Sequence, residues 1–274
     1  MSDSLADRVV VITGSTRGIG RAIAESCAAA GAAVVVSSRD EAALAETVGA
    51  IRTSSGRASG VVCDVRDPEH VEALFAHALD TWGHLDVWVN NAGISQGYRP
   101  FDELAPEEID DIVRTNLTGA MYGSAVALRH FREHGGVLLN LIGRGWKGEA
   151  TPHTAAYAAT KAGIASLTRS LAAENRDCPG VHVHALVPGM VPTDFYRDIQ
   201  TSPRLEATRG NVDLALNAFG VPLDVVGRKT AAFLADEAWR GTGTVVNLLG
   251  GVRVLRGGAL MAWYGMSGQM KRDS

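Results

Sequence analysis

Tyr157 and Lys161 stand four residues apart in an Ala-rich segment that predicts a helix, so their side chains project from one helical face. A free phenol has a pKa of about 10, and an ammonium group beside it stabilises the phenolate and lowers that pKa. A tyrosine held in this way suits a general acid that protonates an alkoxide, and a general base in the reverse direction. The pair therefore predicts proton transfer at a carbonyl or alcohol group.

A second set of residues suits phosphate binding. The run from Thr13 to Gly20 places Gly14, Gly18 and Gly20 between an apolar β-branched stretch and an Ala-rich one. Glycine there permits a tight turn, lets the backbone approach a pyrophosphate and allows the next helix to lie close to the strand. The run predicts a dinucleotide site at the start of the first helix.

The elements that must position these residues alternate along the chain. Short, continuous apolar runs predict parallel strands covered on both faces, and they fall at residues 9–13, 33–37, 60–63, 87–90, 137–142, 181–186 and 244–247. Longer Ala-rich segments, several with a proline near the start, predict helices near residues 18–30, 40–53, 68–82, 106–132, 155–175 and 223–236. This order predicts an α/β fold, a single Rossmann-like doubly wound parallel sheet of about seven strands flanked by helices.

The length suits one domain over residues 1–274, and the sequence contains no repeat or linker. Two segments depart from the alternation. Residues 192–221 are irregular and polar, which predicts a substrate loop. Residues 252–274 form a C-terminal extension with several large apolar side chains. We expect the extension to pack on its own subunit or a neighbour, with closure of an apolar substrate pocket as the alternative.

Composition narrows the class of protein. A net charge of −4 gives no electrostatic case for binding nucleic acid or an anionic membrane. Cys27, Cys63 and Cys178 lack CxxC spacing, which favours reduced thiols in a cytoplasmic protein. The polar start and the absence of an apolar run of roughly 18 residues predict neither a signal peptide nor a membrane span. His182 and His184 share a strand face without further ligands, so we expect a structural role and no metal site.

The glycine loop has the spacing TGxxxGxG, which resembles the short-chain dehydrogenase/reductase family. The likeness spans roughly residues 8–251 in the family's order. Its further segments are Asp64-Val65, Asn91-Ala92-Gly93 within NNAG, Asn116 in RTNLTGA, Tyr157 and Lys161 in YAATK, Pro188-Gly189 with Val191 and Thr193 in PGMVPT, and NLLGG at 247–251. The resemblance implies a nicotinamide cofactor bound by these segments and by Gly14, Thr16, Arg17, Gly18, Ile19 and Gly20.

The family likeness also has implications for partners. It implies a small carbonyl or alcohol substrate, and a homo-oligomer (dimer or tetramer) formed by the helices near 106–132 and 155–175. By the same resemblance, Asn116 orders a helix kink and a water linked to Lys161, and Lys161 also holds the nicotinamide ribose.

The end of the second strand favours NADP(H). An acidic residue there normally binds the ribose hydroxyls of NAD, but this chain has Ser38 and Arg39. Arg17 of the glycine loop would face the same ribose, so two guanidiniums and a hydroxyl could hold a 2′-phosphate. Asp40 leaves an alternative open, because its carboxylate could pair with Arg39 or approach the ribose.

The family's catalytic serine, just after the fifth strand, is missing. Alignment on Asn140 puts Gly143 in its place, whereas counting back from Tyr157 puts Arg144 there. Gly143 is preferred, because a loop absorbs an extra residue more easily than a buried strand shifts. Losing an oxyanion donor commonly costs about 10²–10³ in rate, so either another donor substitutes or the reaction is unusual. The candidate donors are Arg144, Trp146, Thr151, His153 and Thr154.

The segment around Tyr157 also resembles the chlorophyll b reductase branch, which likewise departs from the serine pattern and implies a bulky carbonyl substrate. The sequence thus predicts an NADPH-dependent oxidoreductase that interconverts a carbonyl and an alcohol, with Tyr157 as acid/base. Two alternatives stay open. One is a redox-neutral enzyme (dehydratase, epimerase or cyclase), and the other is an NADP(H)-binding sensor with poor turnover.

Overall fold

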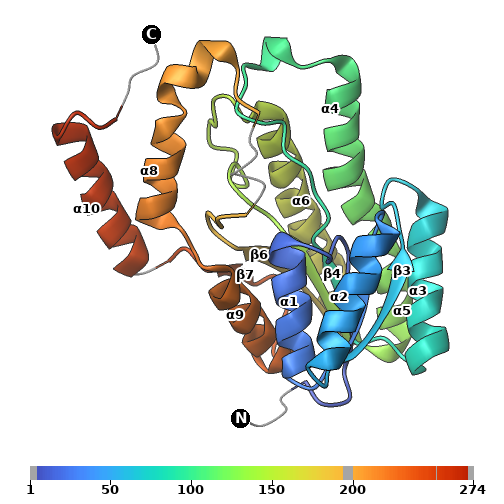
Figure 1. Cartoon of the computed structure of the whole chain (residues 1–274). Coiled ribbons are helices and arrows are strands. Elements are labelled where there is room, and N and C mark those ends of the chain that lie inside the picture. The colour runs from blue at the N-terminus through green and yellow to red at the C-terminus, as the bar shows by residue number, and fades with distance from the viewer. Residues whose placement is uncertain (1–4, 194–199, 251, 271–274) are drawn as a thin grey trace.

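The centre of the molecule is a parallel sheet of seven strands. The computed structural model describes residues 5–193, 200–250 and 252–270, and it places the sheet between the helices (Figure 1). The strand order is β3-β2-β1-β4-β5-β6-β7. The strands are β1 Val9–Ile12, β2 Ala33–Ser38, β3 Arg57–Val62, β4 Val87–Asn90, β5 Gly136–Leu141, β6 Val181–Val187 and β7 Val245–Asn247. The predicted Rossmann-like sheet is confirmed. Its order reverses between β1 and β4, the point at which such sheets bind ligands beyond the carboxyl ends of their strands.

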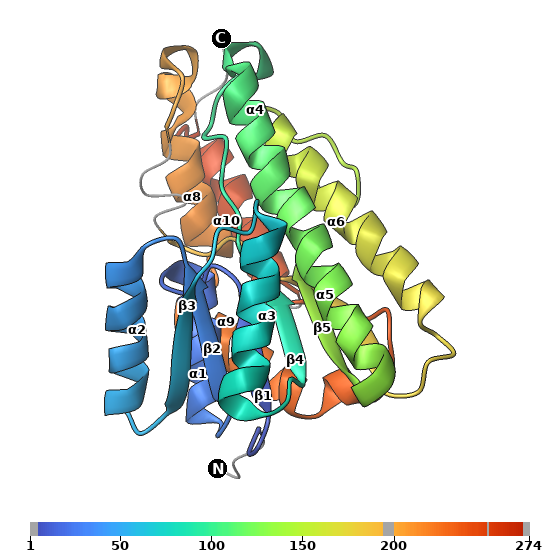
Figure 2. The same ribbon diagram turned by 90° about the vertical axis from the view of Figure 1, so that its right-hand side faces the viewer.

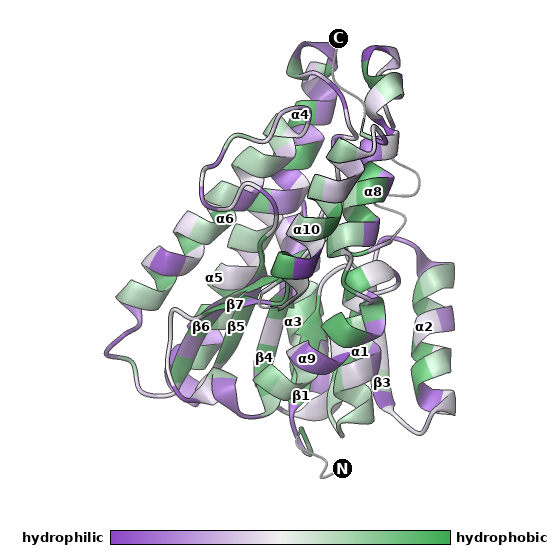
Figure 3. Ribbon diagram, turned by 90° about the vertical axis from the view of Figure 1, so that its left-hand side faces the viewer, coloured by the Kyte–Doolittle hydropathy of each residue, from purple (hydrophilic) through white to green (hydrophobic). Residues whose placement is uncertain are grey.

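Helices cover both faces of the sheet. They are α1 Gly18–Ala29, α2 Glu41–Thr53, α3 Pro68–Trp82, α4 Pro106–Val113, α5 Gly119–His134, α6 Ala155–Glu174, α8 Gly210–Phe219, α9 Leu223–Ala235 and α10 Val252–Met266. Figure 2 shows α3 and α5 in front of the strands, and Figure 3, from the opposite side, shows α1, α2 and α9. None of the described helices is long and apolar enough to cross a membrane.

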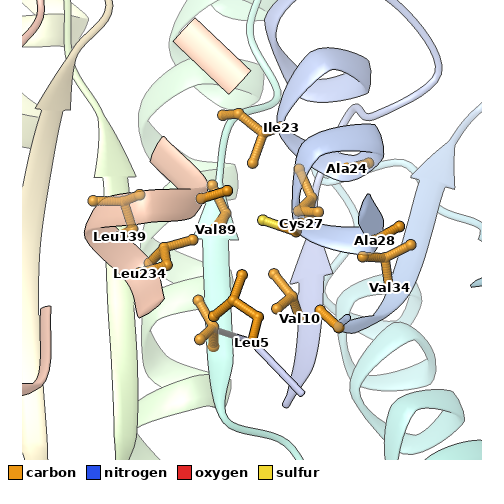
Figure 4. Close-up of a cluster of buried hydrophobic side chains, with 14 of the residues drawn as sticks. Leu5, Val10, Ile23, Ala24, Cys27, Ala28, Val34, Val89, Leu139 and Leu234 are labelled. Atoms are coloured by element: carbon orange, nitrogen blue, oxygen red, sulfur yellow. The ribbon is translucent and has the colours of Figure 1, made fainter. Parts of the chain in front are cut away.

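Continuous apolar strands give the sheet a core on each face. Val10 and Ile12 pack with α1, α2 and α9, whereas Val9 and Val11 pack with α3, α5 and α6 on the other face. Figure 4 shows the first core, where Cys27 of α1 lies among strand side chains. Burial on both faces explains why these strands are not alternating in sequence.

The buried histidine of β6 has the structural role expected. The Nδ1 of His184 accepts the Thr244 N–H at 3.3 Å, and its Nε2 lies 2.8 Å from the Ala238 carbonyl oxygen. Burial lowers the pKa of His184, which favours this neutral form. Within the described residues, no group of three or more His, Cys, Asp and Glu side chains could hold a metal ion.

The helix expected over 106–132 is divided. A π-helical turn, Arg114–Thr118, separates α4 from α5 and contains Asn116. Such wide turns are frequent at functional sites, and uniform helical periodicity does not reveal them.

The prediction that residues 192–221 are irregular is wrong for their second half. Pro203–Thr208 forms a 3₁₀ helix and is followed by α8, while residues 194–199 lie outside the described residues. Arg209, the N-cap of α8, makes no side-chain capping bond, so the usual start signal is missing.

The C-terminal extension forms α10, which lies beside α8 (Figures 1 and 3). A Cβ added to Gly257 would lie only 2.3 Å from Phe219 Cδ1, so glycine allows the two helices to approach closely. The contact between α8 and α10 thus stabilises both helices, and it could not be recognised from the sequence of either segment alone.

Candidate active site

A cavity of about 980 Å³ lies beyond the carboxyl ends of the strands. It brings together every predicted site residue except Asn116. The predicted residues that line it are Gly14, Thr16, Arg17, Gly18, Ile19, Gly20, Ser38, Arg39, Asp64, Val65, Asn91, Ala92, Gly93, Gly143, Arg144, Tyr157, Lys161, Pro188, Gly189, Val191 and Thr193.

The glycine loop is held by groups of the segment that follows β4. The Asn91 side chain donates to the carbonyl oxygens of Thr13 at 2.8 Å and Gly14 at 2.9 Å. The backbone N–H groups of Asn91 and Ala92 both donate to Thr13 Oγ1 at 3.0 Å. Asn91 therefore lines the cavity while its amide fixes the loop.

Glycine is required in this loop for steric reasons. Gly14 has φ +62° and Gly18 has φ +53°, in the left-handed region that glycine adopts readily. A Cβ added to Gly20 would lie 2.4 Å from the Gly14 carbonyl oxygen. The loop leaves the N-terminus of α1 without a side-chain cap, and the first turn of α1 has no acidic residue. Its N–H groups therefore suit an anion such as a pyrophosphate.

The segment after β6 closes over the same loop. Val191 is buried, and the Thr193 N–H donates to its carbonyl oxygen at 2.7 Å. A Cβ added to Gly18 would be 3.5 Å from Thr193 Cγ2. The PGMVPT segment thus lies against the glycine loop.

Two guanidiniums, those of Arg17 and Arg39, line the cavity near the end of β2, and the charge of Arg39 helps to lower the pKa of Asp64. Within the described residues, neither Arg17 nor Arg39 forms an ion pair or a side-chain hydrogen bond. The Asp40 carboxylate accepts the Ala43 N–H at 3.0 Å and caps α2. Ser38 Oγ accepts from Thr16 Oγ1 and from the Asp40 N–H. The carboxylate closest in sequence to Arg39 is thus engaged elsewhere.

Asp64 is paired with its neighbour. Its Oδ2 lies 2.7 Å from the Arg66 guanidinium, which holds the pKa of Asp64 below its usual range. The carboxylate lines the cavity in its ionised form.

Tyr157 and Lys161 lie on α6, which runs along the cavity. Lys161 is only 5% exposed, and its Nζ donates to the Leu141 carbonyl oxygen at 3.0 Å. The same Nζ is 5.5 Å from the centre of the Tyr157 ring. Burial lowers the pKa of Lys161 to about 8, so the ammonium form is costly but present at neutral pH.

Gly143 lies directly beside the tyrosine hydroxyl. A Cβ added to Gly143 would be 2.8 Å from Tyr157 Oη, closer than such atoms normally approach. The hydroxyl therefore uses the space that a side chain at position 143 would need.

Gln96 was not expected from the sequence. It lines the cavity, is 2% exposed, and its Oε1 accepts the Tyr157 N–H at 3.1 Å. Its Nε2 donates to the carbonyl oxygens of His153 at 3.1 Å and Arg99 at 3.3 Å. Thr154, the N-cap of α6, makes no side-chain capping bond. Gln96 thus satisfies a helix-start N–H from 61 residues away.

Asn116 does not line the cavity; it lies behind the residues that do. Its Oδ1 accepts the Ile94 N–H at 2.7 Å, and its Nδ2 donates to the Ile94 carbonyl oxygen and to Thr160 Oγ1. It thereby ties the loop after β4 to α6. Its predicted water link to Lys161 stays a prediction.

The candidates for the missing hydrogen-bond donor divide into two groups. Arg144 and Trp146 line the cavity, whereas Thr151, His153 and Thr154 do not. A further hydroxyl, Ser95, enters from the loop after β4. Its Oγ accepts the Gly97 N–H at 3.0 Å, and a hydroxyl in that position still has a proton to donate. A search of the sequence near the fifth strand alone misses it.

Similar proteins share both the sequence pattern and the fold. The family model described as short chain dehydrogenase matches residues 8–204. 3beta-hydroxysteroid dehydrogenase 1 of Eggerthella lenta is 38% identical over 265 residues, 94% of this chain and 98% of that protein. Chlorophyll(ide) b reductase NOL of Oryza sativa is 37% identical over 224 residues, 79% of this chain and 63% of that protein. The crystal structure of a variant actinorhodin polyketide ketoreductase with NADPH has a TM-score of 0.78 and 32% identity, covering 92% of this chain and 99% of that one. The predicted likeness to the chlorophyll b reductase branch is confirmed.

Proposed function

Since the chain belongs to the short-chain dehydrogenase family, we propose that it is an NADPH-dependent oxidoreductase that interconverts a carbonyl and an alcohol. The observation that carries this proposal is the cavity itself, which Tyr157, Lys161 and the glycine loop line together. When bound, the nicotinamide cofactor supplies or accepts the hydride. The protein's part is to bind, orient and move a proton.

Tyr157 is the proposed acid/base. In reduction, its Oη gives a proton to the substrate oxygen, and in oxidation it takes one from the alcohol. The buried Lys161 ammonium stabilises the phenolate that remains, because Coulomb attraction is strong where water is excluded.

NADPH is the proposed cofactor, bound at the adenosine ribose by Arg17, Ser38 and Arg39. Two guanidiniums that form no ion pair or side-chain hydrogen bond among the described residues suit a dianionic 2′-phosphate. Asp40 does not oppose this, because its carboxylate caps α2.

We place Gly143 at the family's serine position. The absence of a side chain there lets the Tyr157 hydroxyl occupy the space beside it. The lost hydroxyl is then replaced from another segment, and Ser95 lines the cavity with a proton to donate. Met190, Ala215 and Phe219, on or near the 192–221 segment, line the cavity as well, so this segment is the proposed substrate wall.

The decisive experiment follows the consumption of NADPH against a panel of carbonyl compounds. We expect turnover with the wild type and almost none with Tyr157→Phe, which keeps the ring and should still bind NADPH. Tight NADPH binding without turnover on any carbonyl or alcohol would instead favour the sensor. Conversion of a substrate without net change in NADPH would favour the redox-neutral enzyme.

An oligomer is proposed through α4, α5 and α6. Val113 is 38% exposed and Met121 42% exposed, which leaves apolar surface on the first two of these helices. Light scattering of the purified protein would measure the mass; a monomer at micromolar concentration would contradict this.

A further inference from the structure

Most polar groups at the substrate end of the cavity already have partners within the protein. Glu108 accepts from the Arg99 guanidinium at 2.5 Å through Oε1 and from the Ala105 N–H at 3.0 Å through Oε2. The side-chain amide of Gln96 accepts a hydrogen bond through its oxygen and donates hydrogen bonds through its nitrogen. Neither the ion pair nor this amide needs a ligand to satisfy it.

The loop after β5 is fixed in the same way. Glu149 accepts the Gly145 N–H through Oε1 and the Lys147 N–H through Oε2, both at 3.0 Å. Gly145 has φ +88°, and a Cβ there would lie 2.4 Å from Ala158 Cβ, so the loop lies close on α6. The loop therefore presents its other side chains from a defined backbone.

Arg144 is an exposed side chain of this loop. It lines the cavity and directly follows Gly143, which lies beside the Tyr157 hydroxyl. Within the described part of the chain its guanidinium has no hydrogen bond and no ion pair. A guanidinium offers five N–H donors and no acceptor, and its planar fork matches a carboxylate.

Several apolar side chains line the same cavity as Arg144. Ile94, Trp146, Met190, Phe219 and Leu249 line the same space. Trp146 is partly buried and packs on the cluster that contains Ile142 and Ile164. These side chains together with Arg144 suit a ligand with an apolar body and one group that accepts hydrogen bonds from a cation.

We propose that Arg144 binds a carboxylate, or another anionic group of similar shape, on a substrate that is otherwise apolar. This rests on the proposed function, because the reacting carbonyl must lie in the same cavity beside Tyr157. A charge-assisted pair contributes to affinity and fixes orientation, although the exposure of Arg144 to water weakens it.

The experiment compares an apolar keto acid with its methyl ester as substrates, using the full-length protein and NADPH. We expect the wild type to prefer the acid by about tenfold or more in kcat/KM. Arg144→Gln should lose that preference through a higher KM for the acid, so that acid and ester become similar substrates. Lys147→Gln is the matched control, since Lys147 carries the same charge in the same loop but does not line the cavity. This control should keep the preference.

Two results would overturn the proposal. One is a wild type that treats acid and ester alike. The other is an Arg144→Gln variant that loses kcat equally on both, because Arg144 would then act on the reacting oxygen. Calorimetry measures binding of the keto acid to the NADPH-loaded protein without requiring turnover. It therefore tests the anion site independently of the proposed function. Binding that depends on Arg144, without turnover of either compound, would support the anion site and contradict the reductase.

Discussion

The backbone N–H of Tyr157 donates a hydrogen bond to the side chain of Gln96, which lies on a different segment after β4. The proposed acid/base is therefore held from outside its own helix. The same amide also binds two carbonyl oxygens, so its removal would leave several buried polar groups without partners.

We expect Gln96→Met to lower kcat by about 10–100-fold, because small displacements of a reacting group are costly. The affinity for NADPH should change by less than about twofold, since the glycine loop is untouched. Gln96→Glu keeps an acceptor for the Tyr157 N–H and should retain more activity than the Met variant. A Met variant with unchanged kcat would show that the contact does not position Tyr157.

Cofactor preference is tested at Arg17 and Arg39. Each change to Ala should weaken NADPH binding by about 1.5–3 kcal/mol and leave NADH binding unchanged. Arg21→Ala is the matched control, since that arginine lies on α1 but pairs with Glu25 and Glu46. Fluorescence titration measures both nucleotides. Equal affinity of the wild type for NADH and NADPH would contradict the proposal.

Gly143 is tested by adding side-chain atoms one at a time. Gly143→Ala should lower kcat by about tenfold or more, because the new Cβ would displace the Tyr157 hydroxyl. Gly143→Ser should also be slower than the wild type on the natural substrate. Gly49→Ala, on α2 where nothing lies within 4 Å, should have no effect. Steady-state kinetics decide the matter, and a faster Ser variant would count against a specialised pocket.

Lys161→Met should abolish turnover and yet make folding less dependent on pH. The folded pKa of Lys161, about 8, lies below its ordinary value of 10.5, so burial of the charge destabilises the fold below pH 8. Between the two values the unfolded chain binds more protons, so wild-type stability rises with pH relative to the variant. From pH 7 to pH 9.5 the difference in unfolding free energy should shift by about 2 kcal/mol in favour of the wild type. Urea unfolding at both pH values measures this, and a constant difference would exclude such a shift in pKa.

The sequence predicts the sheet well because local signals are sufficient there. Continuous apolar runs identify all seven strands, although β3 begins at Arg57 and not at residue 60. Asp67 and Pro68 give α3 a clear start, and Gly83 ends it with φ +83°. No such signal precedes α8. This helix packs against α10 on one side, and its residues Ala215 and Phe219 line the cavity.

All the predicted catalytic and cofactor-binding residues except Asn116 meet in one cavity, because most of them belong to segments that follow the carboxyl ends of parallel strands. Gln96 and Ser95 could not be found in the same way. The contact of Gln96 with Tyr157 and the position of Ser95 in the cavity lining depend on how the loop after β4 folds, and no spacing in the sequence encodes that. A polar residue shortly after the NNAG segment is the only signal that could have drawn attention to them.

Phe219 connects the C-terminal helix to the substrate end of the cavity. Its ring lines the cavity and also lies under Gly257 of α10, where any side chain would collide with it. A substitution on α10 can therefore move a wall of the pocket while the cofactor loop and α6 keep their places. Relatives of this protein could diverge in the compounds they accept by mutating a helix that never touches those compounds, and a comparison restricted to cavity-lining positions would overlook the cause.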